Sequence, residues 1–188
     1  MPENLEYIYT SFPDKKIRRE NIEIGGKTAK ELECELNLAK IDISGVAEFM
    51  LRSHDFITNK NVESVTLICL TVADLGFIGK ATIDKIYQRA EELGLELCPV
   101  EVGPHYRLQY QNQPRNECIR VGMKLISDSG GSPRVFSLGC DSDGLWLDPP
   151  GYAEQRVGVR TMSLCSVSAR LPARQAGLKL KILVPLIL

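Results

Sequence analysis

The sequence predicts an α+β fold, in which short N-terminal helices precede a mostly antiparallel sheet covered by one amphipathic helix. Three observations predict it. Two helix start signals occur before residue 55, an apolar run over residues 65–72 has the character of a buried strand, and the chain after residue 95 is divided by Pro and Gly into short strand-like segments. Hydrophobic residues make up 44% of the 188 and charged residues 25%, which is typical of a chain that buries a core.

The first portion, residues 1–55, combines a polar segment with two short predicted helices. Thr28 can cap the first helix while the side chain of Glu31 reaches back to it, which is the reciprocal pattern of a capping box. Leu32 and Leu36 then lie on one face at helical spacing. Ser44 can cap a second helix in the same way.

The central portion, residues 56–148, is predicted to be the α+β core domain. The stretch "VESVTLICLTV" is apolar on both alternating sets, as a strand buried on both faces would be. A helix is expected to begin after Thr82, because an apolar stripe recurs at helical spacing up to Leu93. Asp143–Gly144 suits a hairpin turn, since glycine tolerates a positive φ. The candidate strands after this helix are 95–102, 106–110, 117–126, 134–139 and 144–147.

The last portion, residues 149–188, is a basic segment of undefined packing. No acidic residue follows Glu154, whereas six Arg and Lys residues do, so the first 154 residues carry 17 basic and 24 acidic side chains. A basic tail on an acidic body can dock on that body, on a membrane surface or on nucleic acid. All three alternatives stay open at this point.

The cysteines and the N-terminus predict a reduced, cytoplasmic protein. None of the six cysteines forms a CxxC pair, which argues against a zinc knuckle and a thioredoxin-type motif. The N-terminus lacks the basic and apolar regions of a signal peptide. No apolar run approaches the roughly 20 residues of a membrane span. We expect no metal site and no cofactor.

The stretch "ELGLELCPVEVGPHYRLQY" contains the densest chemistry of the chain. Cys98, Glu101 and His105 are the candidate catalytic residues, because a Cys–His pair needs only proximity in space to make a nucleophile. An enzyme, either a hydrolase or a transferase, is therefore one alternative. In an extended strand, however, Cys98 and Glu101 point to opposite faces, which favours a buried cysteine with Glu101, His105 and Arg107 on an exposed or cleft-lining face.

The leading functional prediction is a non-catalytic binding module, because no coherent catalytic set emerges. Its ligand or partner is left open, with another protein as one candidate and nucleic acid as another. A third alternative is a nucleic-acid-associated protein that uses the basic tail and basic residues of the sheet. Against it, aromatic residues make up only 6% of the chain and no strand alternates basic and aromatic residues. The candidate binding residues of the sheet are Arg107, Arg120, Lys124 and Arg134.

A string of motifs carries a resemblance to a known family. "LTVADLGF", "ATIDKIYQRAEELGLELCPVEVGPHYRLQY", "IRVGMKLISDSGGSPRVFSLG" and "DGLWL" resemble a family of uncharacterised open reading frames from uncultivated bacteria. The resemblance covers about half of the chain and implies domain limits but no activity. After "DGLWL" the chain departs from the family pattern. One hypothesis is that a frame change replaced the last strand, and reading the gene in its other frames tests it.

Overall fold

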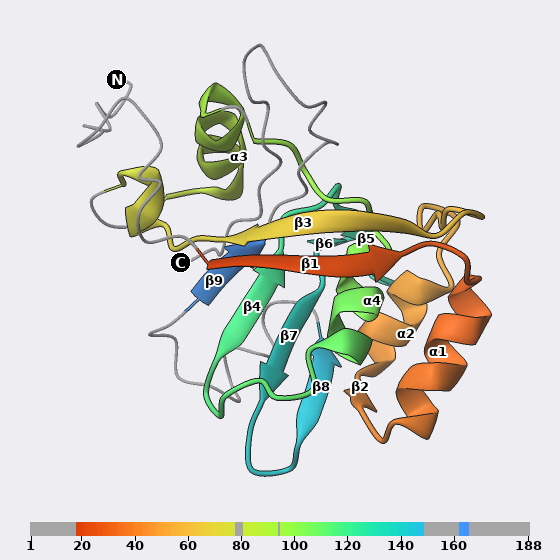
Figure 1. The fold of residues 1–188 in the computed structure, drawn as a ribbon. Coiled ribbons are helices and arrows are strands. Elements are labelled where there is room, and N and C mark those ends of the chain that lie inside the picture. Colours follow the sequence, from red (N-terminus) through yellow and green to blue (C-terminus); the bar gives the residue numbers. More distant parts are fainter. Residues whose placement is uncertain (1–17, 78–80, 94, 149–161, 166–188) are drawn as a thin grey trace.

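A computed structural model describes residues 18–77, 81–93, 95–148 and 162–165, and confirms the α+β class (Figure 1). A two-stranded ribbon crosses over a larger sheet, and helix α4 lies beneath the ribbon (Figure 1). The ribbon consists of β1 (Arg18–Ile24) and β3 (Glu63–Cys69), which pair antiparallel. The strand predicted over 65–72 is therefore confirmed as β3, shifted by a few residues.

The larger sheet has the strand order β2-β8-β7-β4-β9 among the residues that the structure describes. Its three central strands, β4 (Cys118–Val121), β7 (Ser137–Cys140) and β8 (Leu145–Asp148), pair antiparallel as a meander. The short edge strands β2 (Asp42–Ile43) and β9 (Met162–Cys165) pair in parallel with β8 and β4. A separate small hairpin joins β5 (Ile126–Ser127) to β6 (Pro133–Arg134).

Three helices begin where the sequence predicts, and the first two of them have side-chain caps. α1 (Ala29–Leu38) has a complete capping box, in which Thr28 Oγ1 accepts from the Glu31 N–H at 3.3 Å and Glu31 Oε2 accepts from the Thr28 N–H at 2.8 Å. α2 (Gly45–Leu51) is capped by Ser44, whose Oγ accepts from the Ala47 N–H at 3.1 Å. α3 (Ile83–Glu92) follows Thr82 as predicted, after a short 3₁₀ helix, η2 (Ala73–Leu75).

The strands predicted over 95–102 and 106–110 are wrong. Residues 102–109 form a helix, α4 (Val102–Gln109), and the preceding segment contributes one bridge, between Cys98 and Met123. Pro104 is compatible with this helix because it lies in the first turn, where its missing N–H would have no intrahelical acceptor. Gly103 fits in this helix because it has no side chain: a Cβ at this position would lie 2.8 Å from the side chain of Phe136. The predicted strand 117–126 is divided into β4 and β5.

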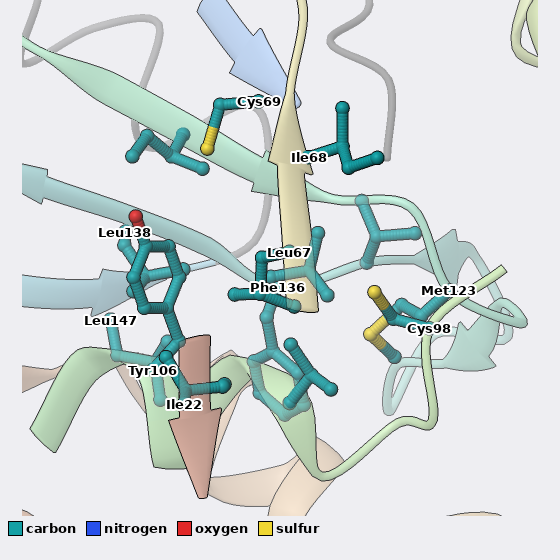
Figure 2. Packing of buried hydrophobic residues seen from close by; sticks show 14 of the residues in the cluster. Ile22, Leu67, Ile68, Cys69, Cys98, Tyr106, Met123, Phe136, Leu138 and Leu147 are labelled. Carbon is teal, nitrogen blue, oxygen red and sulfur yellow. The ribbon is translucent and has the colours of Figure 1, made fainter. Parts of the chain in front are cut away.

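The main core lies between the ribbon, α4 and one face of the larger sheet. Ile22 and Leu67 of the ribbon point toward Tyr106 of α4, toward Leu138 of β7 and toward Phe136, which precedes β7 (Figure 2). Side chains alternate along a strand, so the pairing of β4, β7 and β8 places two rows of side chains on the opposite face of the larger sheet. Trp146 covers Gly139 in one row, and the other row joins Arg120, Ser137 and Asp148, all buried.

Part of the predicted basic tail forms β9, and the rest of residues 149–188 lies outside the described residues. Residues 1–17, 78–80 and 94 also lie outside them. Within the described ranges, no helix has the length and apolar character needed to cross a membrane.

The contact between Gly139 and Trp146 predicts a stability effect with a matched control. Gly139→Ala places a methyl group 1.9 Å from Trp146 Cζ2, so we expect the free energy of unfolding to fall by about 1–3 kcal/mol or more. Gly45→Ala meets no atom within 4 Å at the start of α2 and should be neutral or slightly stabilising. Urea unfolding of both variants measures the difference. Equal stabilities would contradict the packing described.

Candidate functional site

Three polar side chains lie one turn apart along α4 and at the N-cap residue before it. Each of them makes a hydrogen bond to the backbone of a segment that is distant in the sequence. They are Glu101, His105 and Gln109, and we call them the α4 stripe. Residues four apart occupy the same face of a helix, so a single face carries all three. Their partners are in β1, in the turn after β1 and in the loop between α2 and β3.

Gln109 closes the outer edge of β1. Its Nε2 donates to the Glu23 carbonyl at 2.7 Å, and its Oε1 accepts from the Glu23 N–H at 3.0 Å. A side-chain amide thus makes the pair of hydrogen bonds that a neighbouring strand would make. An edge strand otherwise presents such groups to any extended chain, and covering them is a common protection against aggregation.

His105 accepts a hydrogen bond from the turn that follows β1. The Gly25 N–H donates to His105 Nε2 at 3.2 Å, and both residues are buried. An imidazole nitrogen accepts only when it carries no proton, so this contact places the hydrogen of the neutral ring on Nδ1. The ring therefore acts as a fixed acceptor for a backbone group that has left the β1–β3 ladder.

Glu101 divides its two oxygens between the loop and the histidine. Oε1 accepts from the Asn59 N–H at 3.1 Å, while Oε2 lies 3.5 Å from His105 Nε2. Oε2 is buried and has no hydrogen-bond partner among the described residues. The carboxylate precedes the first residue of α4, where the helix dipole favours a negative charge.

Two glycines let the turn after β1 approach the loop that the α4 stripe holds. Gly25 and Gly26 have φ values of +81° and +71°, which favour glycine. A Cβ at Gly25 would lie 2.1 Å from the Asn61 carbonyl oxygen, and the Gly26 N–H donates to the Asn59 carbonyl at 2.8 Å. Residues 52–62 connect α2 to β3. We call them the apolar loop, after its apolar side chains Phe56, Ile57 and Val62.

Cys98 lies in the core rather than in the α4 stripe. Its sulfur packs beside Met123 (Figure 2), and its N–H donates to the Gly122 carbonyl at 2.8 Å. Burial raises the pKa of the Cys98 thiol well above its usual range, which disfavours the thiolate that a nucleophile requires. Glu101 Oε2 lies 3.5 Å from His105 Nε2. The structure therefore brings together Glu101 and His105, two of the three candidate catalytic residues, but not Cys98.

Arg107 is a fully buried cation that donates hydrogen bonds to neutral acceptors. Its guanidinium donates to the Gln113 amide oxygen, to the Tyr110 carbonyl and to the Gly139 carbonyl, the last at 3.2 Å. Burial lowers the pKa of Arg107 to about 10, so the group stays charged at neutral pH. It ties the end of α4 to the centre of the larger sheet, which is a structural role.

The other basic candidates do not share one exposed face. Arg120 is buried in register with Ser137, whereas Lys124 is exposed. Arg134 is partly exposed, and its Nε donates to Asp128 Oδ2 at 2.8 Å within the β5–β6 hairpin. With Arg107 and Arg120 inside the protein, these four residues form no common surface for phosphate contacts.

Sequence reasoning missed Gln109, Asn59 and the Gly25–Gly26 turn as parts of this arrangement. The available signal was the four-residue spacing of Glu101, His105 and Gln109, which matches one face of a helix. Dividing the chain at Gly103 and Pro104 into two strands conceals that spacing.

The described residues contain no group of three His, Cys, Asp or Glu side chains that could hold a metal ion. Comparisons with family models, curated proteins and solved structures found no match. The resemblance to a bacterial family stays a prediction.

Gln109 and Gln111 offer a matched test of the α4 stripe. Gln109→Ala removes both bonds to Glu23, and we expect it to lower the free energy of unfolding by about 0.5–1.5 kcal/mol and to speed amide exchange at Glu23. Gln111 donates only to carbonyls of α4 itself, so Gln111→Ala should be nearly neutral. Hydrogen exchange and urea unfolding measure both effects. An unchanged exchange rate at Glu23 in Gln109→Ala would contradict the edge role.

The thiols of Cys98 and Cys34 should differ in reactivity. Cys98 is buried with a raised pKa, whereas Cys34 is exposed on α1. At about pH 8 we expect an alkylating reagent to label Cys98 at least about tenfold more slowly than Cys34 in the native protein, with the difference lost on unfolding. Peptide-resolved mass spectrometry measures both rates. Comparable native rates would restore Cys98 as a candidate nucleophile.

Proposed function

We propose that this protein is a non-catalytic binding module that takes a protein partner through the apolar loop. The observation that carries the proposal is a pair of exposed apolar side chains on a loop that the interior holds in place. Ile57 and Val62 are 72% and 62% exposed. Leu38 at the end of α1 and Phe49 in α2 are also exposed, so residues 38–62 hold most of the exposed large apolar side chains among the described residues.

The apolar loop is anchored at two points between these exposed side chains. The ring of Phe56 is buried against Phe136 in an edge-to-face contact, with 6.0 Å between ring centroids. Asn59 is held through its N–H by Glu101 and through its carbonyl by Gly26. A loop ordered before binding loses less conformational entropy when a partner docks, which supports a recognition role.

The chemistry of the interior supports binding over catalysis. Glu101 and His105 are buried, and both accept hydrogen bonds from backbone N–H groups. A general acid or base must reach its substrate directly or through one water molecule, and neither side chain has appreciable exposure.

The exposed chemistry of the loop region favours a protein over a nucleic acid. Exposed apolar side chains are typical of protein–protein contacts, whereas nucleic-acid contacts depend on clustered cations. The cytoplasm remains the predicted location of this module, on the sequence grounds given above.

Site-specific cross-linking tests the proposal, with Leu97 as the matched control. Leu97 is 38% exposed but lies outside the apolar loop, between α3 and α4. A photo-cross-linking amino acid at position 57 should capture a defined protein that the same group at position 97 does not. Ile57→Ser should then weaken the affinity of that protein by about fivefold or more, while Leu97→Ser changes it by less than about twofold.

Two outcomes would overturn the proposal. Cross-links from position 57 could be no more specific than those from position 97, or Ile57→Ser could leave the measured affinity unchanged. Circular dichroism of each variant confirms that the fold persists, since Ile57 and Leu97 are both outside the buried core.

A further inference from the structure

We infer that His105 and Glu101 form a proton-sensitive switch that controls how firmly the apolar loop is held. The inference rests on the proposed function of that loop, because it assigns a regulation to the same surface. It starts from one atom with two competing partners. His105 Nε2 lies 3.2 Å from the Gly25 nitrogen and 3.5 Å from Glu101 Oε2.

The two protonation states of the ring favour different partners. In the neutral ring, Nε2 accepts from the Gly25 N–H, and Glu101 Oε2 is left without a hydrogen bond among the described residues. When a proton from solvent binds Nε2, the nitrogen becomes a donor and faces the Gly25 N–H, which is also a donor. The new N–H then turns to Glu101 Oε2 and forms a charge-assisted bond. Each state leaves one buried polar group unsatisfied, which is Glu101 Oε2 in the neutral state and the Gly25 N–H in the protonated state.

Glu101 is the charged group that pairs with the ring, at 3.5 Å from Nε2. On β1, the Glu23 side chain is exposed, and across the ladder Glu63 Oε1 accepts from Asn59 Nδ2 at 3.3 Å. Before α1, Lys27 pairs with Glu35 at 2.5 Å. The core beside α4 is apolar. It contains Leu32 and Leu36 of α1, Leu138 and Leu147 of the larger sheet, and Phe136, which precedes β7.

The switch is connected to the apolar loop through Asn59. Gly25 adjoins Gly26, whose N–H holds the Asn59 carbonyl, and Glu101 Oε1 holds the Asn59 N–H. Protonation of His105 therefore releases the turn on one side of Asn59 and pulls the carboxylate on the other. Ile57 and Val62 lie within three residues of this attachment. We expect the loop to be less ordered in the protonated state and to bind its partner more weakly.

Nuclear magnetic resonance of the wild-type protein, recorded across about pH 8 to pH 5, tests the switch. The second histidine, His54, has a side chain that is 92% exposed and serves as an internal control. The Gly25 amide should shift with the midpoint of the His105 ring, and its exchange protection factor should fall by about tenfold or more. The Cys98 amide, bonded to Gly122, should keep its protection.

His105→Gln provides the matched variant, because a glutamine amide oxygen can accept from the Gly25 N–H at every pH. It should abolish the pH dependence of the Gly25 amide. For the partner captured through position 57, the wild-type affinity should fall by about threefold or more from pH 7.5 to 5.5, and the His105→Gln affinity should not.

Three results would overturn the switch. The His105 ring could fail to titrate in this range, the ring could titrate without a change at Gly25, or the Gly25 change could persist in His105→Gln. If the variant does not fold, the wild-type titration decides alone. These measurements need no partner, so failure of the switch is distinguishable from failure of the proposed binding function.

Discussion

Helix α4 is buried on most of its surface, so the polar groups that it carries require partners inside the protein. Glu101, His105 and Gln109 meet this constraint by bonding to backbone groups of β1, of the following turn and of the apolar loop. These bonds fix the ribbon above the larger sheet and set the path of the chain into α1. The position of the ribbon therefore depends on the polar face of a helix as well as on apolar contacts.

The same constraint explains why a segment with the residues of an active site can have a structural role. A carboxylate and an imidazole inside a protein are costly unless they are hydrogen-bonded, and backbone N–H groups next to a strand edge supply those bonds. Arg107 follows the same logic with carbonyl acceptors. What the interior holds in place is the apolar loop, whose exposed side chains are available to a partner.

Local signals predicted the parts of the fold whose causes are local. The capping of α1 by Thr28 and of α2 by Ser44 depends on residues at most three positions away. The turn at Asp143–Gly144 likewise follows from the positive φ of one glycine, +125°. The sequence pattern does not reveal α4 for two reasons: burial on most sides removes the amphipathic stripe that identifies a helix, and Pro104 separates two strand-like segments although it lies in the first helical turn.

The sequence by itself determined the α+β class, the starts of three helices and the hairpin turn at Asp143–Gly144, because each depends on neighbouring residues and on the periodicity of apolar side chains. Only the tertiary structure decided what the candidate site residues do. The partners of Glu101, His105 and Gln109 lie 42, 80 and 86 residues away along the chain. Contacts over such separations leave no spacing in the sequence, since they depend on how the ribbon, the loop and α4 pack together.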